Sequence, residues 1–211
     1  MEQFLLPERK GVYSLLRALY TYPLNQSVLD IVTQLQVESD SSLAMGLLQM
    51  QASLHVNGEP AATLDELNIE MTRLLEGPGL TPAPPYASYY LNNKQLMGPS
   101  AVAARQVYLQ WQAVPAGDTR LPDDHIALEL GFVAHLAQLA DEGNETALAA
   151  SRNFLRQHLL PWLPHFCGTL AKSSRISFFT GLAHLTQTAV QADVAWLDQV
   201  LTETTEAVKT V

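Results

Sequence analysis

Residues 63–86 read TLDELNIEMTRLLEGPGLTPAPPY, and this stretch decides the class of fold. Thr63 followed by Glu66 has the spacing of a capping box, in which the two residues bond each other's backbone N–H groups at a helix start. The apolar residues that follow recur three or four positions apart, which is the period of a buried helix face. They are Leu67, Met71, Leu74 and Leu75. Pro78 and the prolines after it cannot lie inside a helix. The stretch therefore predicts a capped helix followed by a stiff, extended loop over residues 77–86.

Helical spacing continues on both sides of this stretch. The predicted helices are one over Val12–Leu19 ended by Pro23, a second capped by Ser27, a third that starts at Ser41 or Ser42, one opened by Pro99 and Ser100, a long one from Asp123 and Asp124 to Leu139, one from Asn144 toward Pro161, and two over residues 175–191 and 193–207. A second irregular loop is predicted over residues 114–121. Alternating strand patterns are almost absent, so the sequence predicts an all-α bundle of roughly ten helices with a proline-rich loop. No linker divides the chain, and we expect residues 1–211 to form one all-helical domain.

Composition narrows the class of protein. Hydrophobic residues make up 47% of the chain and charged residues 16%, which is typical of a globular protein and too apolar for a disordered one. No stretch approaches the roughly 20 apolar residues that a membrane-spanning helix needs. Residues 1–10 lack the basic start and apolar run of a secretory leader, so we expect a cytoplasmic protein. Cys167 is the single cysteine and lies among apolar neighbours, which predicts a core position.

The net charge of −9 bears on the partner. The chain has 21 acidic and 12 basic residues, which argues against nucleic acid because phosphate binding needs a basic surface. An acidic surface is compatible with a partner that carries arginines. Ordinary solubility explains the same charge, so acidity alone does not separate the two interpretations.

The richest polar cluster is Asp123-Asp124-His125 with Glu129. His125 and Glu129 are four residues apart and would share a helix face, where Glu129 could accept a hydrogen bond from the imidazole. Asp123 and Asp124 would lie in the first helical turn, where carboxylates are favourable. A plain helix start, with His125 extending the cap, explains the same residues. A metal-dependent hydrolase is an alternative for this cluster. However, neither a His pair four residues apart around a Glu nor a repeated Glu-x-x-His motif is present, and we expect no metal and no cofactor.

Three blocks of sequence together resemble a known family. They are MTRLLEGP (71–78) continuing into PPYASYYL (84–91), PDDH (122–125) with ELGF (129–132), and FLRQHLLPW (154–162) with Phe166. In this order and spacing they resemble the TorD/DmsD family of redox-enzyme maturation chaperones, and the proline-rich segment is most similar to the DmsD-like branch. The chain departs from the family pattern at Leu121, where the family has a glutamate, and at Met71 and Leu75, where aromatic residues are common.

The resemblance implies a cytoplasmic chaperone and no enzyme activity. Its client would be a molybdenum-cofactor oxidoreductase of the DMSO/TMAO reductase type. The chaperone would bind the client's twin-arginine signal peptide and hold it back from export until cofactor insertion and folding are complete. The implied partners are this leader peptide and the body of the catalytic subunit, with the export machinery as a further candidate. A purely structural helical subunit of a larger complex is a further interpretation of the same sequence.

The implied binding site combines apolar walls with acidic groups. We expect the apolar part of the leader to dock in a groove. The expected walls are Met71, Leu74, Leu75, Tyr86 and Pro122. Carboxylates would pair with the two arginines, and the candidates are Glu76, Asp123, Asp124 and Glu129. His125 would anchor the polar corner of the groove.

Overall fold

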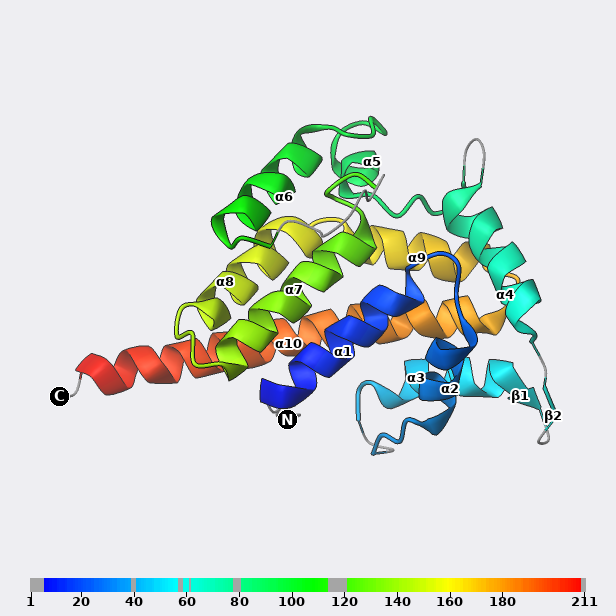
Figure 1. Cartoon of the computed structure of the whole chain (residues 1–211), viewed down its shortest axis with the longest axis horizontal. Helices are drawn as coiled ribbons and strands as arrows, with labels where there is room; N and C mark the ends of the chain where they lie inside the picture. Colours follow the sequence, from blue (N-terminus) through cyan, green and yellow to red (C-terminus); the bar gives the residue numbers. More distant parts are fainter. Residues whose placement is uncertain are drawn as a thin grey trace.

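The computed structural model describes residues 6–38, 41–56, 59–60, 62–77, 81–113 and 121–209, and most of these are helical (Figure 1). The helices are α1 (Leu6–Leu19), α2 (Gln26–Gln34), α3 (Ala44–Leu54), α4 (Leu64–Met71), α5 (Ala87–Leu91), α6 (Pro99–Gln110), α7 (Ile126–Asp141), α8 (Ala147–Phe154), α9 (Leu163–Ser173) and α10 (Ser177–Lys209). Two π-helical turns, η1 (Thr72–Glu76) and η2 (Leu155–Leu159), extend α4 and α8. Strands β1 (His55–Val56) and β2 (Glu59–Pro60) form a short antiparallel pair. The predicted all-α class is confirmed.

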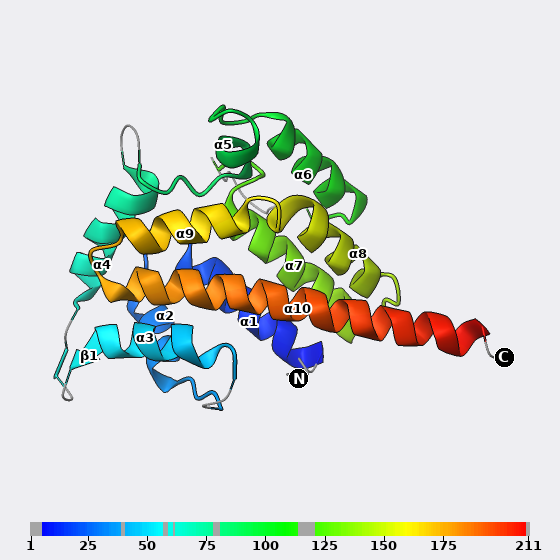
Figure 2. The same ribbon diagram turned by 180° about the vertical axis from the view of Figure 1, so that it is seen from behind.

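Helix α10 runs along the long axis of the molecule, as Figures 1 and 2 show from opposite sides. Helices α3 and α9 pack against α10, and α1 packs against α7. Helices α5 and α6 lie at one edge of the molecule, and α2 and α3 lie at the opposite edge. No helix in the described ranges is both long enough and apolar enough to cross a membrane.

Two glycines allow α3 and α10 to approach each other closely. A Cβ atom added at Gly46 would lie 2.6 Å from the backbone nitrogen of Leu185 and 2.8 Å from the carbonyl oxygen of Gly181. A Cβ atom added at Gly181 would lie 2.7 Å from the carbonyl oxygen of Gly46. Since both sets of neighbours are backbone atoms, a side chain could fit only if the helices moved apart.

A buried ion pair joins α1 to α10. Arg9 donates two hydrogen bonds to the carboxylate of Asp193, at 2.6 and 3.0 Å, and the Tyr13 hydroxyl donates a third at 2.8 Å. The guanidinium of Arg9 also lies over the ring of Trp196, 5.4 Å from its centroid. Arg9 and Asp193 are both fully buried. The first described helix is therefore fixed to the last by a charged contact inside the core.

Several predicted helix boundaries need correction. The capping box at Thr63 and Glu66 is present, but Asn25 rather than Ser27 caps α2. Helix α3 begins at Ala44 without a side-chain cap. The two helices predicted near the C-terminal end are one continuous helix, α10, because Asp193 binds Arg9 within the core instead of capping a new helix.

Helix α9 was missed, because Pro161 suggested the end of a helical region. Its own proline, Pro164, lies in the first turn, where the missing N–H costs little. Cys167 on α9 is buried, as predicted. Residues 78–80 and 114–120 of the two predicted loops lie outside the described residues.

Candidate functional site

The segment after the proline-rich loop pairs with the turn before α7 like two short antiparallel strands. Two backbone hydrogen bonds make this pairing, from Ala87 N to the Asp124 carbonyl (3.0 Å) and from Ile126 N to the Pro85 carbonyl (2.9 Å). They bring Tyr86 directly opposite His125. Two of the three sequence blocks are thus held side by side by backbone contacts.

The loop is also anchored to η1. The backbone nitrogen of Ala83 donates to the carbonyl of Leu74 in η1, at 3.0 Å. Glu76, the last residue of η1, therefore lies near the paired segments, and its side chain reaches to 3.5 Å from Nε2 of His125. The structure brings Glu76, Tyr86 and His125 together.

Asp124 caps helix α5. One carboxyl oxygen of this buried residue accepts a hydrogen bond of 2.6 Å from the backbone nitrogen of Ser88, in the first turn of α5. The prediction that Asp123 and Asp124 lie in the first turn of α7 is therefore wrong, because α7 begins only at Ile126. Asp124 instead accepts a hydrogen bond from a free backbone N–H group at the start of a different helix, α5.

Asp123 faces the surface beside α6. Its carboxylate lies 3.1 Å from a guanidinium nitrogen of Arg105, and its backbone carbonyl accepts a hydrogen bond of 2.8 Å from Tyr108. The side chain of Arg105 is 61% exposed and that of Asp123 is 18% exposed. Since exposed ion pairs contribute little free energy, Asp123 can exchange this partner at small cost.

His125 is the N-cap of α7. Its Nδ1 accepts a hydrogen bond of 3.1 Å from the backbone nitrogen of Ala127, which leaves the proton of the neutral ring on Nε2, facing Glu76. The ring of Tyr86 packs against the imidazole in an edge-on contact, with the centroids 5.1 Å apart. The simpler interpretation of His125 as part of the helix cap is confirmed.

Glu129 lies one turn into α7 and is 1% exposed. Its Oε2 accepts a hydrogen bond of 3.2 Å from the indole nitrogen of Trp162, so the predicted bond between Glu129 and His125 is absent. Burial raises the pKa of Glu129 well above its usual range; the bond from Trp162 opposes this rise, and the neighbouring Asp124 adds to it. Trp162 belongs to the third sequence block but was not among the predicted site residues.

Glu129 also lines a cavity of about 240 Å³ between α5, α6, α7 and η2. The other lining residues are Ala87, Leu91, Pro99, Ser100, Ala103, Gln157 and His158. Buried Ala87 and Glu129 form its floor, while exposed Leu91, Pro99 and Gln157 lie toward solvent. Burial lowers the pKa of His158. No pattern in the sequence indicates that these segments meet.

The residues predicted to form the apolar walls of the groove do not all reach the surface. Met71, Leu74 and Leu75 are at most 2% exposed and belong to the core beneath the loop. Tyr86 and Pro122 are half-buried and reach the surface. Burial, with the nearby charge of Glu76, raises the pKa of Tyr86 to about 12. Met71, Leu74 and Leu75 thus lie beneath the site, and Tyr86 and Pro122 are available for contact with a ligand.

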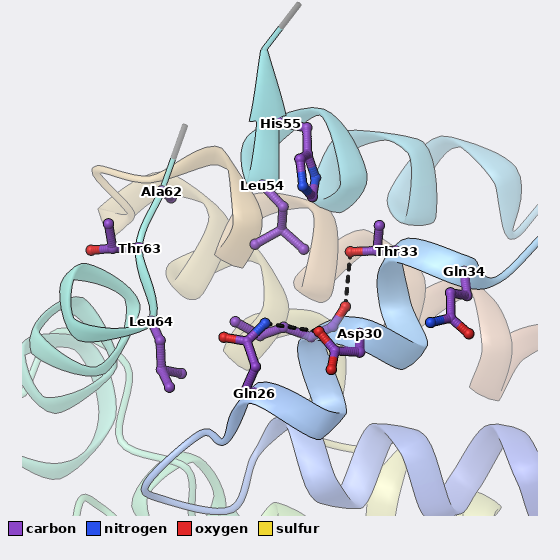
Figure 3. Close-up of a pocket in the computed structure, with 10 residues that line it drawn as sticks. Gln26, Asp30, Thr33, Gln34, Leu54, His55, Ala62, Thr63 and Leu64 are labelled. Carbon is purple, nitrogen blue, oxygen red and sulfur yellow. Dashed lines mark hydrogen bonds between the residues drawn. The ribbon is translucent and has the colours of Figure 1, made fainter. Parts of the chain in front are cut away.

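A larger cavity lies elsewhere. About 410 Å³ in volume, it is enclosed by α2, the end of α3 and the start of α4, and Figure 3 shows the residues that line it. At its edge, the side-chain amide of Gln26 donates to the carboxylate of Asp30, at 2.8 Å. None of the predicted site residues lines this cavity. Nowhere in the described ranges do three His, Cys, Asp or Glu side chains converge on a metal position, and the hydrolase alternative has no support.

Comparison with known proteins shows the family to which the chain belongs. Residues 37–168, more than half of the chain, match the family described as "Nitrate reductase delta subunit". The chain therefore belongs to this family, that of the TorD and DmsD chaperones of redox-enzyme maturation.

Individual relatives agree with this assignment. The chain is 32% identical over 125 residues to "Chaperone protein TorD" of Vibrio cholerae, an alignment that covers 57% of each protein. It is 35% identical over 119 residues to "Probable Tat proofreading chaperone DmsD" of Haemophilus influenzae, covering 56% of this chain and 55% of that one. With TorD of Shewanella pealeana, 27% identity extends over 217 residues, 92% of this chain and 91% of the relative. The chain thus spans little more than half the length of the Vibrio and Haemophilus relatives in these alignments. All three relatives are named as chaperones.

A solved structure has the same fold. The crystal structure of a proposed redox enzyme maturation protein from Archaeoglobus fulgidus matches with a TM-score of 0.53 at 18% identity. The match covers 88% of this chain and 94% of that one.

Proposed function

We propose that this protein is a cytoplasmic chaperone for a molybdenum-cofactor oxidoreductase of the DMSO/TMAO reductase type. It binds the twin-arginine leader of this client and keeps the client from export until the cofactor is inserted and folding is complete. The body of the catalytic subunit is a second contact. The names of the relatives support this role, since one is a chaperone protein TorD and another is a probable Tat proofreading chaperone DmsD. The structural observation that carries the proposal is the backbone pairing that gathers Glu76, Tyr86 and His125 beside Asp123.

The gathered groups suit a leader with two arginines followed by an apolar stretch. Glu76 is partly exposed and can accept bidentate hydrogen bonds from a guanidinium. Asp123 can do the same by exchanging Arg105 for an incoming arginine. Tyr86 and Pro122 supply apolar surface, with a hydroxyl at one edge. Met71, Leu74 and Leu75 hold these residues in place from beneath.

The test is a binding titration with the full chain and fluorescent leader peptides from the molybdoenzymes of the same genome. We expect one leader to bind, and its affinity to fall when both arginines are changed to lysine. Glu76→Gln and Asp123→Asn should each weaken binding by about two- to tenfold, as expected for partly exposed charge pairs. Asp141→Asn is the matched control, because Asp141 is exposed at the far end of α7. Equal affinity for leaders with and without the arginines would contradict the proposal.

Affinity capture tests the role in the cell. Tagged protein from cells grown without oxygen should recover a leader-bearing molybdoenzyme, and the recovery should be lost when the twin arginines of that enzyme are changed. Recovery of a stable complex that does not depend on the leader would favour the structural-subunit interpretation instead.

A further inference from the structure

The buried acids of this protein fall into two kinds. Four acidic side chains are buried in the described part of the chain: Glu70, Asp124, Glu129 and Asp193. Arg73 donates two hydrogen bonds of 2.7 Å to Glu70, and Arg9 binds Asp193 in the same bidentate way. Asp124 and Glu129 have no arginine or lysine partner among the described residues. A buried carboxyl without a counter-ion is costly in its charged form.

Of the two unpaired acids, Glu129 lines a cavity that is open to a ligand. The cavity measures about 240 Å³, whereas a single water needs only roughly 10–15 Å³, so a side-chain head group can enter. Ala87, Leu91, Pro99 and Ala103 provide short apolar walls that suit the methylene groups of a long side chain.

The polar groups of the cavity are arranged to accept hydrogen bonds. Oε2 of Glu129 is taken by Trp162, which leaves Oε1 for a ligand. The hydroxyl of Ser100 donates to Asn92, at 2.8 Å, so its lone pairs are free to accept. Gln157 also lines the cavity, and its side-chain amide includes a carbonyl that can accept a hydrogen bond. A planar cation with several N–H donors matches this set better than an anion does.

We infer that this cavity binds one guanidinium group of the client's leader, with Glu129 as its counter-ion, and that Glu129 loses its proton to solvent when the group enters. The inference rests on the proposed function and identifies an arginine position separate from Glu76 and Asp123. The proton balance is simple: a neutral carboxylic acid becomes a carboxylate paired with the guanidinium, and one proton is released for each complex formed.

The groups around Glu129 explain why ligand binding is coupled to the release of its proton. The titratable groups that face it are Asp124, Tyr108 on α6 and His158 on η2. Burial raises the pKa of Tyr108 well above its usual range and lowers that of His158, so both are neutral at pH 7. Since no described arginine or lysine pairs with this carboxyl, the ligand supplies the positive charge that it lacks. Because the complex needs the ionised form and the free protein favours the neutral form, affinity should rise with pH.

The first test measures leader affinity against pH with the full chain. The probe is a labelled peptide with two arginines followed by a short run of leucine and alanine. For wild type we expect the affinity to rise by up to about tenfold per pH unit, the slope for release of one proton. Glu129→Gln should bind about tenfold more weakly at pH 8 and show a flat profile. Glutamine has the shape of the neutral acid and can still accept from Trp162, so this variant should fold. Glu142→Gln, at the exposed end of α7, is the matched control and should behave as wild type.

The second test does not depend on the leader. Trp162 donates its indole N–H to Glu129, so its ¹⁵N–¹H resonance reports on the carboxyl. Argininamide at millimolar concentration should shift this resonance in wild type and leave it unmoved in Glu129→Gln. If the peptide binds but Glu129→Gln keeps the affinity and pH profile of wild type, the inference is overturned and the proposed function stands. If no leader binds while argininamide shifts the indole, the proposed function fails and the guanidinium site stands.

Discussion

Glu129 links the stability of the folded protein to pH, independently of any ligand. Burial raises its folded pKa, so between the unfolded value of about 4.3 and the folded value the native state binds more protons than the unfolded state. Stability must therefore fall as pH rises through this window. Glu129→Gln removes the effect. We expect the stability of the variant minus that of wild type to increase by about 1.4 kcal/mol per pH unit above pH 4.3, until the folded pKa is reached.

Urea unfolding of both proteins at a series of pH values measures this difference, and the subtraction cancels the contributions of the other carboxyls. A difference that stays constant from pH 4 to pH 8 would show that Glu129 titrates as it does in the unfolded chain. The burial argument would then be wrong.

His125 contributes to stability through its cap. Its Nδ1 satisfies the backbone N–H of Ala127 in the first turn of α7. His125→Ala should therefore cost about 1 kcal/mol of unfolding free energy, and His125→Asn, another good N-cap, should cost less. Denaturant unfolding checks the order of the two variants. If alanine and asparagine were equally destabilising, packing against Tyr86 would be the main role of the imidazole.

Sequence patterns identified His125 and Glu129 as candidate site residues but did not predict their side-chain contacts correctly. Spacing of four residues places His125 and Glu129 on one face only if both are helical, but the backbone of His125 is extended, with ψ of 137°. The two side chains therefore diverge, one toward Glu76 and the other toward Trp162. Whether a helix begins before or after a histidine depends on what its ring can bond, and single-sequence patterns do not resolve that.

At the scale of elements, the α3–α10 crossing is set by its two glycines. Gly46→Ala or Gly181→Ala would place a methyl group within 3 Å of backbone atoms. We expect each to lower the unfolding free energy by about 1–3 kcal/mol, as for other overpacked sites. Gly168→Ala in α9 is the control, because nothing lies within 4 Å of its added Cβ. That variant should be stabilised by up to about 1 kcal/mol through helix propensity. Thermal and urea unfolding distinguish the two signs, and a stable Gly46→Ala would mean that the helices separate easily.

Local and long-range signals explain which elements could be predicted. The capping box at Thr63 was predicted correctly because its partners lie three residues apart. The continuity of α10 was not, since Asp193 is satisfied by Arg9, 184 residues away. The proline-rich segment was correctly predicted to be irregular, but its pairing with the turn before α7 depends on backbone contacts between distant residues. Hydrophobic periodicity indicates which face of a helix is buried, but it carries little information on which helices pack together.

At the scale of the whole molecule, the Arg9–Asp193 pair fastens α1 to α10 inside the core, and breaking it should be severe. Asp193→Ala leaves a buried guanidinium without its counter-ion and the Tyr13 hydroxyl without its acceptor. We expect a loss of about 3–5 kcal/mol, a large share of the 5–15 kcal/mol that is typical of natural domains. Replacing the whole set with apolar residues of similar size, Arg9→Met, Tyr13→Phe and Asp193→Leu together, should recover most of this loss, because no charged or polar group then remains unpaired. Urea unfolding of the single, triple and wild-type proteins measures both effects. A triple variant as unstable as Asp193→Ala would show that the ion pair itself, and not merely the absence of an unpaired charge, holds the two helices together.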